Sequence, residues 1–262
     1  MRHLHFDCFS GVSGDMILGA LVDAGLPLAE LARGLKAVKL DGYALRAGRV
    51  RRGGMPATQV EVMIRNGFRA PLPVPRIKRI IASSRLPDRV KKRSLEVFSR
   101  LAQAEAQAHR MAVSRVHFHE VGVVDSLVDV VGGVLGCHLL GADHITASPV
   151  NLGSGTIECA HGTLPVPGPA VAALAKGLPV YSAGPSRELS TPTGLAVLSV
   201  LADEFGPLPL MRSTAIGYGA GAADPPGWTN ALRVFIGEPV PDVMEEAALA
   251  YRKRAHGRRG RA

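Results

Sequence analysis

The order of apolar and polar residues at the amino-terminal end predicts a strand followed by a helix. Residues 3–9, HLHFDCF, alternate polar and apolar side chains, which is typical of a strand with one buried face. A loop with two glycines follows at 10–14. From Asp15 the run MILGALVDAG has helical spacing, with Gly25 as its stop signal. The sequence thus predicts a strand–loop–helix unit within the first 25 residues.

Further along the chain, strands and helices follow one another without a repeat. The patterns predict two strands around a Gly53-Gly54 turn, two helices separated by Leu86-Pro87-Asp88, and a turn-rich second half. The expected strands are 43–51, 57–64, a short one at His117-Phe118-His119, 145–149, 214–218 and 231–236. The expected helices lie within 76–109, at 124–139, after Pro169 and at 193–205. Because strands and helices are interspersed irregularly, the predicted fold class is mixed α/β (α+β).

The distribution of charge distinguishes the carboxy-terminal end of the chain from the rest. The formal net charge of the 262 residues is +9, and six basic residues with no acid fall between Arg252 and Ala262. We therefore expect one domain over residues 1–239, which a break near 110–145 would divide into two subdomains. Residues 240–262 are expected to form a solvated, disordered tail. Such a tail suits an acidic partner or nucleic acid, but aromatic residues are only 5% of the chain, which argues against single-strand binding.

Cysteine usage and hydropathy favour a cytoplasmic protein that does not enter the membrane. The three cysteines, Cys8, Cys137 and Cys159, are an odd number without a CxxC motif, so a disulfide framework is not expected. The amino terminus is too polar for a signal peptide, and no apolar run reaches the roughly 18 residues of a membrane span. The most apolar stretch, 121–140, contains Asp125 and Asp129 and is interpreted as a buried helix.

Two groups of residues carry the chemistry. In the first, Asp7 ends a strand, the loop Ser10-Gly11-Val12-Ser13-Gly14 follows, and Asp15 opens a helix. Carboxylates bind metal and free amides at a helix start bind phosphate, so this layout suits a cation beside an anionic group. It is not a P-loop, because the Gly-Lys-Ser/Thr ending is missing. Equally, Asp15 could merely cap the helix.

The second group is His117, His119 and Glu120, followed by Asp125 and Asp129. On a strand, residues two apart face the same side, and on a helix residues four apart do. Imidazole with carboxylate suits Ni, Zn, Mn or Fe, so these residues predict a metal or acid–base site. The alternative is that Asp125 and Asp129 pair with nearby arginines.

Two weaker signals lie in the second half of the chain. Cys159 and His161 would suit a thiophilic metal or a sulfur-bearing ligand, and would equally suit a buried thiol and a turn histidine. Thr191, Thr193 and Gly194 open a helix and could hold phosphate, although capping is the commoner role of such residues.

Taken in order, six strings resemble one family, the nickel insertion proteins of lactate racemase maturation. They are FDCFSGVSGDMILGALVDAG, VHFHEVGVVDSLVDVVG, SPVNLGSGTIECAHGTLPVPGPA, ELSTPTG, ADEFGP and IGYGAG, and the resemblance runs from His3 to about Glu238. It implies insertion of nickel into a thiocarboxylated pyridinium mononucleotide, with one carbon–nickel and two sulfur–nickel bonds formed, by a CTP-dependent metal-inserting enzyme of the lyase class. It implies catalytic roles for His117, His119 and Glu120.

The resemblance also implies which residues could bind the metal and the mononucleotide, and which partners the protein has. Candidate metal ligands are Asp7, Asp15, His117, His119, Asp125, Asp129, Cys159 and His161. Candidate groups for the mononucleotide are Ser10, Gly11, Ser13, Gly14, Thr191, Thr193 and Gly194. Expected partners are that mononucleotide, lactate racemase apoprotein and further copies of this chain.

Two departures from the family pattern stand out. The stretch NGFRAPLPVP replaces a histidine-rich insertion, so nickel storage is not implied. The chain ends without the family's carboxy-terminal CTP-binding domain, so we expect CTP and its divalent metal to act only if a partner chain supplies that domain. The alternatives from other classes are a metal-dependent phosphohydrolase and a non-enzymatic nickel-binding subunit.

Overall fold

A mixed sheet of seven strands forms the centre of the protein. The computed structural model describes residues 1–65, 72–116, 118, 123–159 and 162–240. The strand order is β2-β3-β10-β11-β1-β4-β9. The strand bounds are β1 His3–Asp7, β2 Tyr43–Arg52, β3 Met55–Ile64, β4 His144–Ala147, β9 Glu204–Phe205, β10 Met211–Ala220 and β11 Ala231–Pro239. The interior strand β1 pairs antiparallel with β11 and parallel with β4, so the sheet is mixed and the class is mixed α/β, as predicted.

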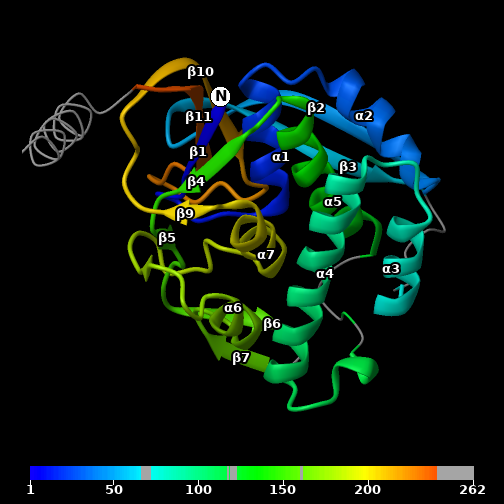
Figure 1. Ribbon diagram of the computed structural model, residues 1–262. Helices are drawn as coiled ribbons and strands as arrows, with labels where there is room; N and C mark the ends of the chain where they lie inside the picture. Colours follow the sequence, from blue (N-terminus) through cyan, green and yellow to red (C-terminus); the bar gives the residue numbers. More distant parts are fainter. Residues whose placement is uncertain (66–71, 117, 119–122, 160–161, 241–262) are drawn as a thin grey trace, which may run out of the picture.

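Helices cover one face of this sheet (Figure 1). Their bounds are α1 Gly14–Asp23, α2 Leu28–Leu35, α3 Val74–Ala82, α4 Asp88–Ala108, α5 Val123–Leu139, α6 Pro169–Leu174 and α7 Pro192–Leu201. Short elements complete the described part: the pair β5 Val150–Asn151 and β8 Val180–Tyr181, the hairpin β6 Thr156–Cys159 and β7 Gly162–Pro165, and the 3-10 turns Lys36–Val38 and Val113–Arg115. None of the described helices combines the length and apolar character that crossing a membrane requires.

Helix α1 lies closer to the sheet than side chains would normally allow. A β-carbon at Gly219 of β10 would lie 1.8 Å from the carbonyl oxygen of Met16, and one at Gly19 would lie 2.4 Å from the carbonyl oxygen of Thr58. Glycine at both positions removes these clashes, so the helix backbone rests directly on β10 and β3. The start of α1, where Asp15 lies, is thereby fixed relative to the sheet.

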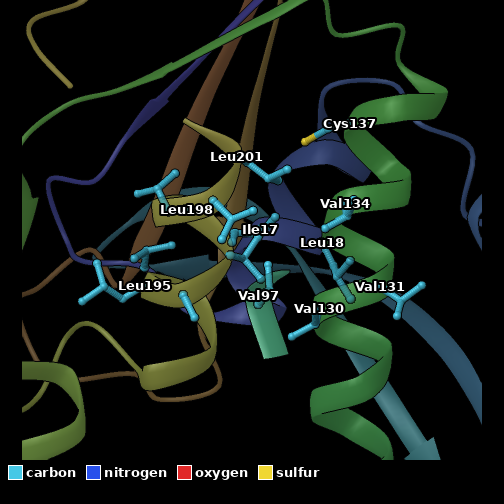
Figure 2. Close-up of a cluster of buried hydrophobic side chains, with 14 of the residues drawn as sticks. Ile17, Leu18, Val97, Val130, Val131, Val134, Cys137, Leu195, Leu198 and Leu201 are labelled. Atoms are coloured by element: carbon cyan, nitrogen blue, oxygen red, sulfur yellow. The ribbon is translucent and has the colours of Figure 1, made fainter. Parts of the chain in front are cut away.

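Helices α1, α5 and α7 run in the same direction and pack against one another. A β-carbon at Gly133 of α5 would meet Ile17 of α1 at 3.3 Å and Val197 of α7 at 3.5 Å, and one at Gly136, a turn later, would meet Leu21 at 2.8 Å. Figure 2 shows Ile17 lying between the leucines of α7 and the valines of α5. Because the three helices are parallel, their amino-terminal ends meet at one end of this core.

Most predicted elements are present, and the differences have local causes. The helix expected over 193–205 ends at Leu201, because Ala202 is extended and the carboxylate of Asp203 accepts the amide of Ile145 at 2.9 Å. Residues 204 and 205 then pair with β4 as β9. The strand expected at 145–149 ends at Ala147. Helix α2 and the β6–β7 hairpin were not predicted. The strand expected at His117-Phe118-His119 lies largely outside the described residues, as does the tail from 241 onward.

Candidate functional site

The candidate site lies where α1, α5 and α7 begin. Gly14, the first residue of α1, packs on Asp129 of α5 without room for a side chain. At Gly194 of α7 a β-carbon would lie 2.4 Å from the carbonyl oxygen of Val12 and 2.5 Å from the Cα of Ser13. Two glycines therefore allow the loop before α1 to fit between the other two helix starts, and this brings Asp15 together with the acids of α5.

Asp15 is held by three hydrogen-bond donors. Its Oδ1 accepts from the hydroxyl of Ser13 and from the amide of Met16 at 2.9 Å, and its Oδ2 accepts from the amide of Ala222 at 3.1 Å. Desolvation raises the pKa of Asp15, and these hydrogen bonds to the charged form oppose the rise. The first turn of a helix also favours a negative charge. Asp15 is thus the well-supported carboxylate of the site.

Asp129 has the opposite environment. Its Oδ1 is shielded from solvent and has no hydrogen-bond partner among the described residues. Desolvation, and then the negative charges of Asp15 and Asp125, raise the pKa of Asp129 well above its ordinary value. Asp129 lies in the second turn of α5, where the helix dipole helps a carboxylate less than it does at the helix start.

Asp125 lies one turn earlier on the same face of α5. It is half-buried, and its Oδ1 accepts the amide of Ser126 at 2.8 Å. No arginine, lysine or histidine among the described residues forms an ion pair with Asp15, Asp125 or Asp129. The alternative that Asp125 and Asp129 are paired with arginines is therefore not found in this part of the chain.

The other predicted metal ligands divide into two sets. Asp7 accepts from Arg233 Nε at 3.0 Å, and that guanidinium lies 4.9 Å from the ring centre of Phe235. The described contacts of Asp7 are thus with β11 and not with the other three acids. His117, His119, Glu120 and His161 lie outside the described residues, as does the side chain of Cys159. Within the described residues, no three His, Cys, Asp or Glu side chains lie close enough together to hold one metal ion.

The predicted phosphate-binding groups are mostly occupied by the protein itself. The hydroxyl of Ser10 accepts from Trp228 Nε1 at 2.6 Å, and the amide of Gly11 donates to the carbonyl of Cys8 at 3.0 Å. The hydroxyl of Thr191 accepts the amide of Gly194 at 3.3 Å, which is the capping role. Ser13 donates to Asp15, and Thr193 is buried at 9% exposure. These hydrogen bonds hold the helix starts together. They use the donors of the Gly11 amide, the Gly194 amide and the Ser13 hydroxyl, whereas the hydroxyls of Ser10 and Thr191 act as acceptors.

One residue that the motif analysis passed over holds the surrounding loops. Asn151 is fully buried, and its amide nitrogen donates to the carbonyls of Phe9 at 2.9 Å and Ala183 at 3.1 Å. Its side-chain oxygen accepts the amides of Gly153 and Ala183, both at 3.1 Å. All four hydrogen-bonding positions are therefore used. The only sequence signal was an asparagine shortly before a Gly-rich turn, which is a common place for such a bond.

Fold and site together define a mixed α/β protein with an acidic group, free of described basic partners, at the junction of three helix starts. The chain belongs to the nickel insertion protein family, whose model matches residues 4–255. It is 45% identical over 238 residues to the pyridinium-3,5-bisthiocarboxylic acid mononucleotide nickel insertion protein of Desulfitobacterium hafniense, covering 91% of this chain and 59% of that protein.

Two further relatives bear the same name. The protein of Geobacillus kaustophilus is 44% identical over 247 residues, with 91% of this chain and 60% of the relative covered. The protein of a Nocardioides species is 46% identical over 233 residues, with 89% and 59% covered. The chain thus spans about three fifths of the length of these relatives. No solved structure matches it.

Proposed function

We propose that this chain takes part in inserting nickel into pyridinium-3,5-bisthiocarboxylic acid mononucleotide. The observation that carries the proposal is its 45% identity, over 91% of its length, to a protein named for that reaction. The acidic group at the helix starts is compatible with the proposal, because carboxylates without an arginine or lysine partner among the described residues can bind a divalent cation.

The reaction requires two kinds of help from the protein. Nickel, as the substrate ion, must be presented to the two thiocarboxylates, and the ring carbon that bonds nickel must lose its proton to a base. His117 and His119 remain predicted nickel ligands, and His117, His119 and Glu120 remain the predicted catalytic residues. Asp125 lies five residues after Glu120 and is the first of the two acids of α5 in the acidic group. Cys159 and His161 stay secondary candidates for a thiophilic ion.

The dependence on CTP is a finer part of the same proposal. We infer that CTP and its divalent metal act through a nucleotide-binding region supplied together with this part of the protein, on the same or a partner chain. Lactate racemase apoprotein is the proposed recipient of the finished cofactor, and a homo-oligomer remains an expectation. The lyase class follows from metal insertion without group transfer.

The two alternatives have less support. A two-metal phosphohydrolase needs a dense set of ligands, and within the described residues no three candidate side chains lie close enough for one ion. Asp7, which that reading requires, is paired with Arg233. The second alternative is a subunit that binds nickel without catalysing its insertion. The experiment below distinguishes this alternative from the proposed function.

The test is a reconstituted insertion reaction. Purified chain, nickel and the thiocarboxylated mononucleotide are incubated with and without CTP, Mg²⁺ and the carboxy-terminal region of a relative, and the product is identified by its mass. We expect product that depends on this chain and on both nickel and CTP. Stoichiometric nickel binding without product under every condition would leave only the binding subunit.

A further inference from the structure

We propose that Asp129 and Asp15 bind a second divalent cation, of the Mg²⁺ or Mn²⁺ type, which is distinct from the nickel that is inserted. This inference rests on the proposed function, which supplies the mononucleotide as substrate. In this inference, the cation holds the phosphate of that mononucleotide. The first observation is the Oδ1 of Asp129, which has no hydrogen-bond partner in the part of the chain that the structure describes. A carboxylate oxygen shielded from water without a donor is costly, so a fold that keeps one is expected to supply a partner.

The surroundings show which kind of partner is missing. Among the described residues, the charges that act on Asp129 are those of Asp15 and Asp125, and both are acids. Two other acids of the protein illustrate the ordinary solution: Asp7 is paired with Arg233, and Asp23 with Arg49 at 2.6 Å. Asp129 has no such arginine in the described part of the chain. A small cation satisfies the same need and neutralises the repulsion between the three carboxylates.

The donor atoms indicate the class of ion. Asp15 and Asp129 offer only carboxylate oxygens, and the adjacent Ser13 offers a hydroxyl. Oxygen donors of this kind suit hard ions, and Mg²⁺ is typically bound by one or two carboxylates together with waters and substrate phosphate. The described side chains supply fewer than three candidate ligands at any one point. An octahedral ion held by two carboxylates keeps about four positions open for water or a ligand.

The open positions match the phosphate of a mononucleotide. At the neighbouring helix starts, the amide of Gly11 already donates to the carbonyl of Cys8, and the amide of Gly194 already donates to the hydroxyl of Thr191. A phosphate approaching three carboxylates directly would also be repelled by them. An ion between the two solves both problems, because it binds carboxylate on one side and phosphate on the other. The proposed phosphate-binding group is therefore the cation and not the loop amides that the sequence suggested.

Manganese provides the probe, because its electron paramagnetic resonance signal reports the free ion. The wild-type chain is titrated with Mn²⁺, without nickel, beside Asp129→Asn and Asp15→Asn, with thermal melts to confirm that each variant is folded. The matched control is Asp23→Asn, another buried acid, whose carboxylate is held by Thr58, Arg49 and the amide of Tyr218. We expect one Mn²⁺ per wild-type or Asp23→Asn chain and binding at least tenfold weaker in the other two variants.

A second arm tests the phosphate. The thiocarboxylated pyridinium mononucleotide should bind the wild-type chain at least tenfold more tightly with Mn²⁺ than without, whereas the corresponding nucleoside should show no such dependence. No stoichiometric Mn²⁺ binding, full binding in Asp129→Asn, or mononucleotide binding indifferent to Mn²⁺ overturns the proposal. Binding of Ni²⁺ but not Mn²⁺ at Asp129 overturns it and leaves nickel insertion intact. If the chain binds Mn²⁺ as expected but the insertion reaction yields no product, the proposed function is wrong and the cation site stands.

Discussion

Gly14 and Asp129 are in direct contact across α1 and α5. A β-carbon added at position 14 would lie 2.5 Å from the Cβ of Asp129 and 2.5 Å from its Oδ2. The Cβ is fixed to the backbone of α5 and cannot turn away, unlike the carboxylate beyond it. The absence of a side chain at Gly14 is therefore what allows the two helix starts, and with them the acids of both helices, to lie together.

Replacing Gly14 by alanine should separate these helix starts. We expect Gly14→Ala to lower the free energy of unfolding by about 1–3 kcal/mol, the usual cost of overpacking, as measured by urea denaturation. Gly48→Ala is the matched control, because a β-carbon there would meet no atom within 4 Å. Gly48 lies within β2, where glycine is unfavourable, so the control should be neutral or slightly stabilising. Equal losses in the two variants would contradict the proposed contact.

The pKa of Asp129 predicts how stability changes with pH. Because this pKa is raised in the folded protein, the folded chain keeps a proton that the unfolded chain releases. The stabilising contribution is complete below the ordinary pKa of 3.8 and is lost as the pH rises through the raised folded-state value. Asp129→Asn lacks this contribution. In chelator, unfolding free energies should therefore shift in favour of the variant as the pH is raised from 4.5 to 8.

The comparison of the two pH profiles isolates Asp129 from the other titrating groups, since those are shared. Profiles that stay parallel over this interval would mean that the folded protein does not raise the pKa of Asp129. A variant that is more stable without metal, yet fails to bind the proposed cation, would show that the position is kept for function and not for stability.

His5 gives a prediction on the acid side. Desolvation by burial is the main cause that lowers the pKa of His5 to about 4, although the nearby Asp7 opposes it. His5 is thus neutral when folded, and the unfolded chain takes up a proton near pH 6.5. Its contribution to stability is present above pH 6.5 and is lost as the pH falls toward 4, by up to about 3 kcal/mol. His5→Gln should lose less stability over this interval in urea titrations, and an unchanged acid slope would contradict the assignment.

Local patterns predicted the elements that depend on neighbouring residues. The β2–β3 hairpin follows from alternation on either side of Gly53-Gly54, and α5 follows from a long apolar run. The spacing of Asp125 and Asp129 correctly placed them on one helix face. Contacts between distant residues were not accessible in this way. Arg233 is separated from Asp7 by 226 residues, and no pattern near either residue indicates the pairing.

The same limit explains what was missed at the helix starts. The meeting of Ser13 and Gly194 depends on how α1 and α7 pack, which periodicity does not determine. The end of α7 at Leu201 depends on the contact of Asp203 with β4, which lies 58 residues away along the chain. Helix α2, which was not predicted, is only eight residues long and follows Pro27.

Asn151 provides the last prediction, because it links three loops with a single side chain. Asn151→Ala removes bonds to Phe9, Gly153 and Ala183 and leaves buried backbone groups without partners. Each such group costs about 1–3 kcal/mol, with some relief from water, so we expect a loss of about 2–5 kcal/mol in unfolding free energy. Hydrogen exchange should accelerate at the amides of Gly153 and Ala183, which lose their acceptor, before the sheet strands are affected.

The variant Asn151→Asp tests the donor and acceptor hydrogen bonds of this side chain separately. It keeps the acceptor for the two amides but places a carboxylate oxygen against the carbonyls of Phe9 and Ala183. It should protect the amides better than alanine does and still destabilise the protein. Wild-type exchange at both amides in Asn151→Ala would show that the loop before α1, and thus the position of Asp15, is held by other contacts.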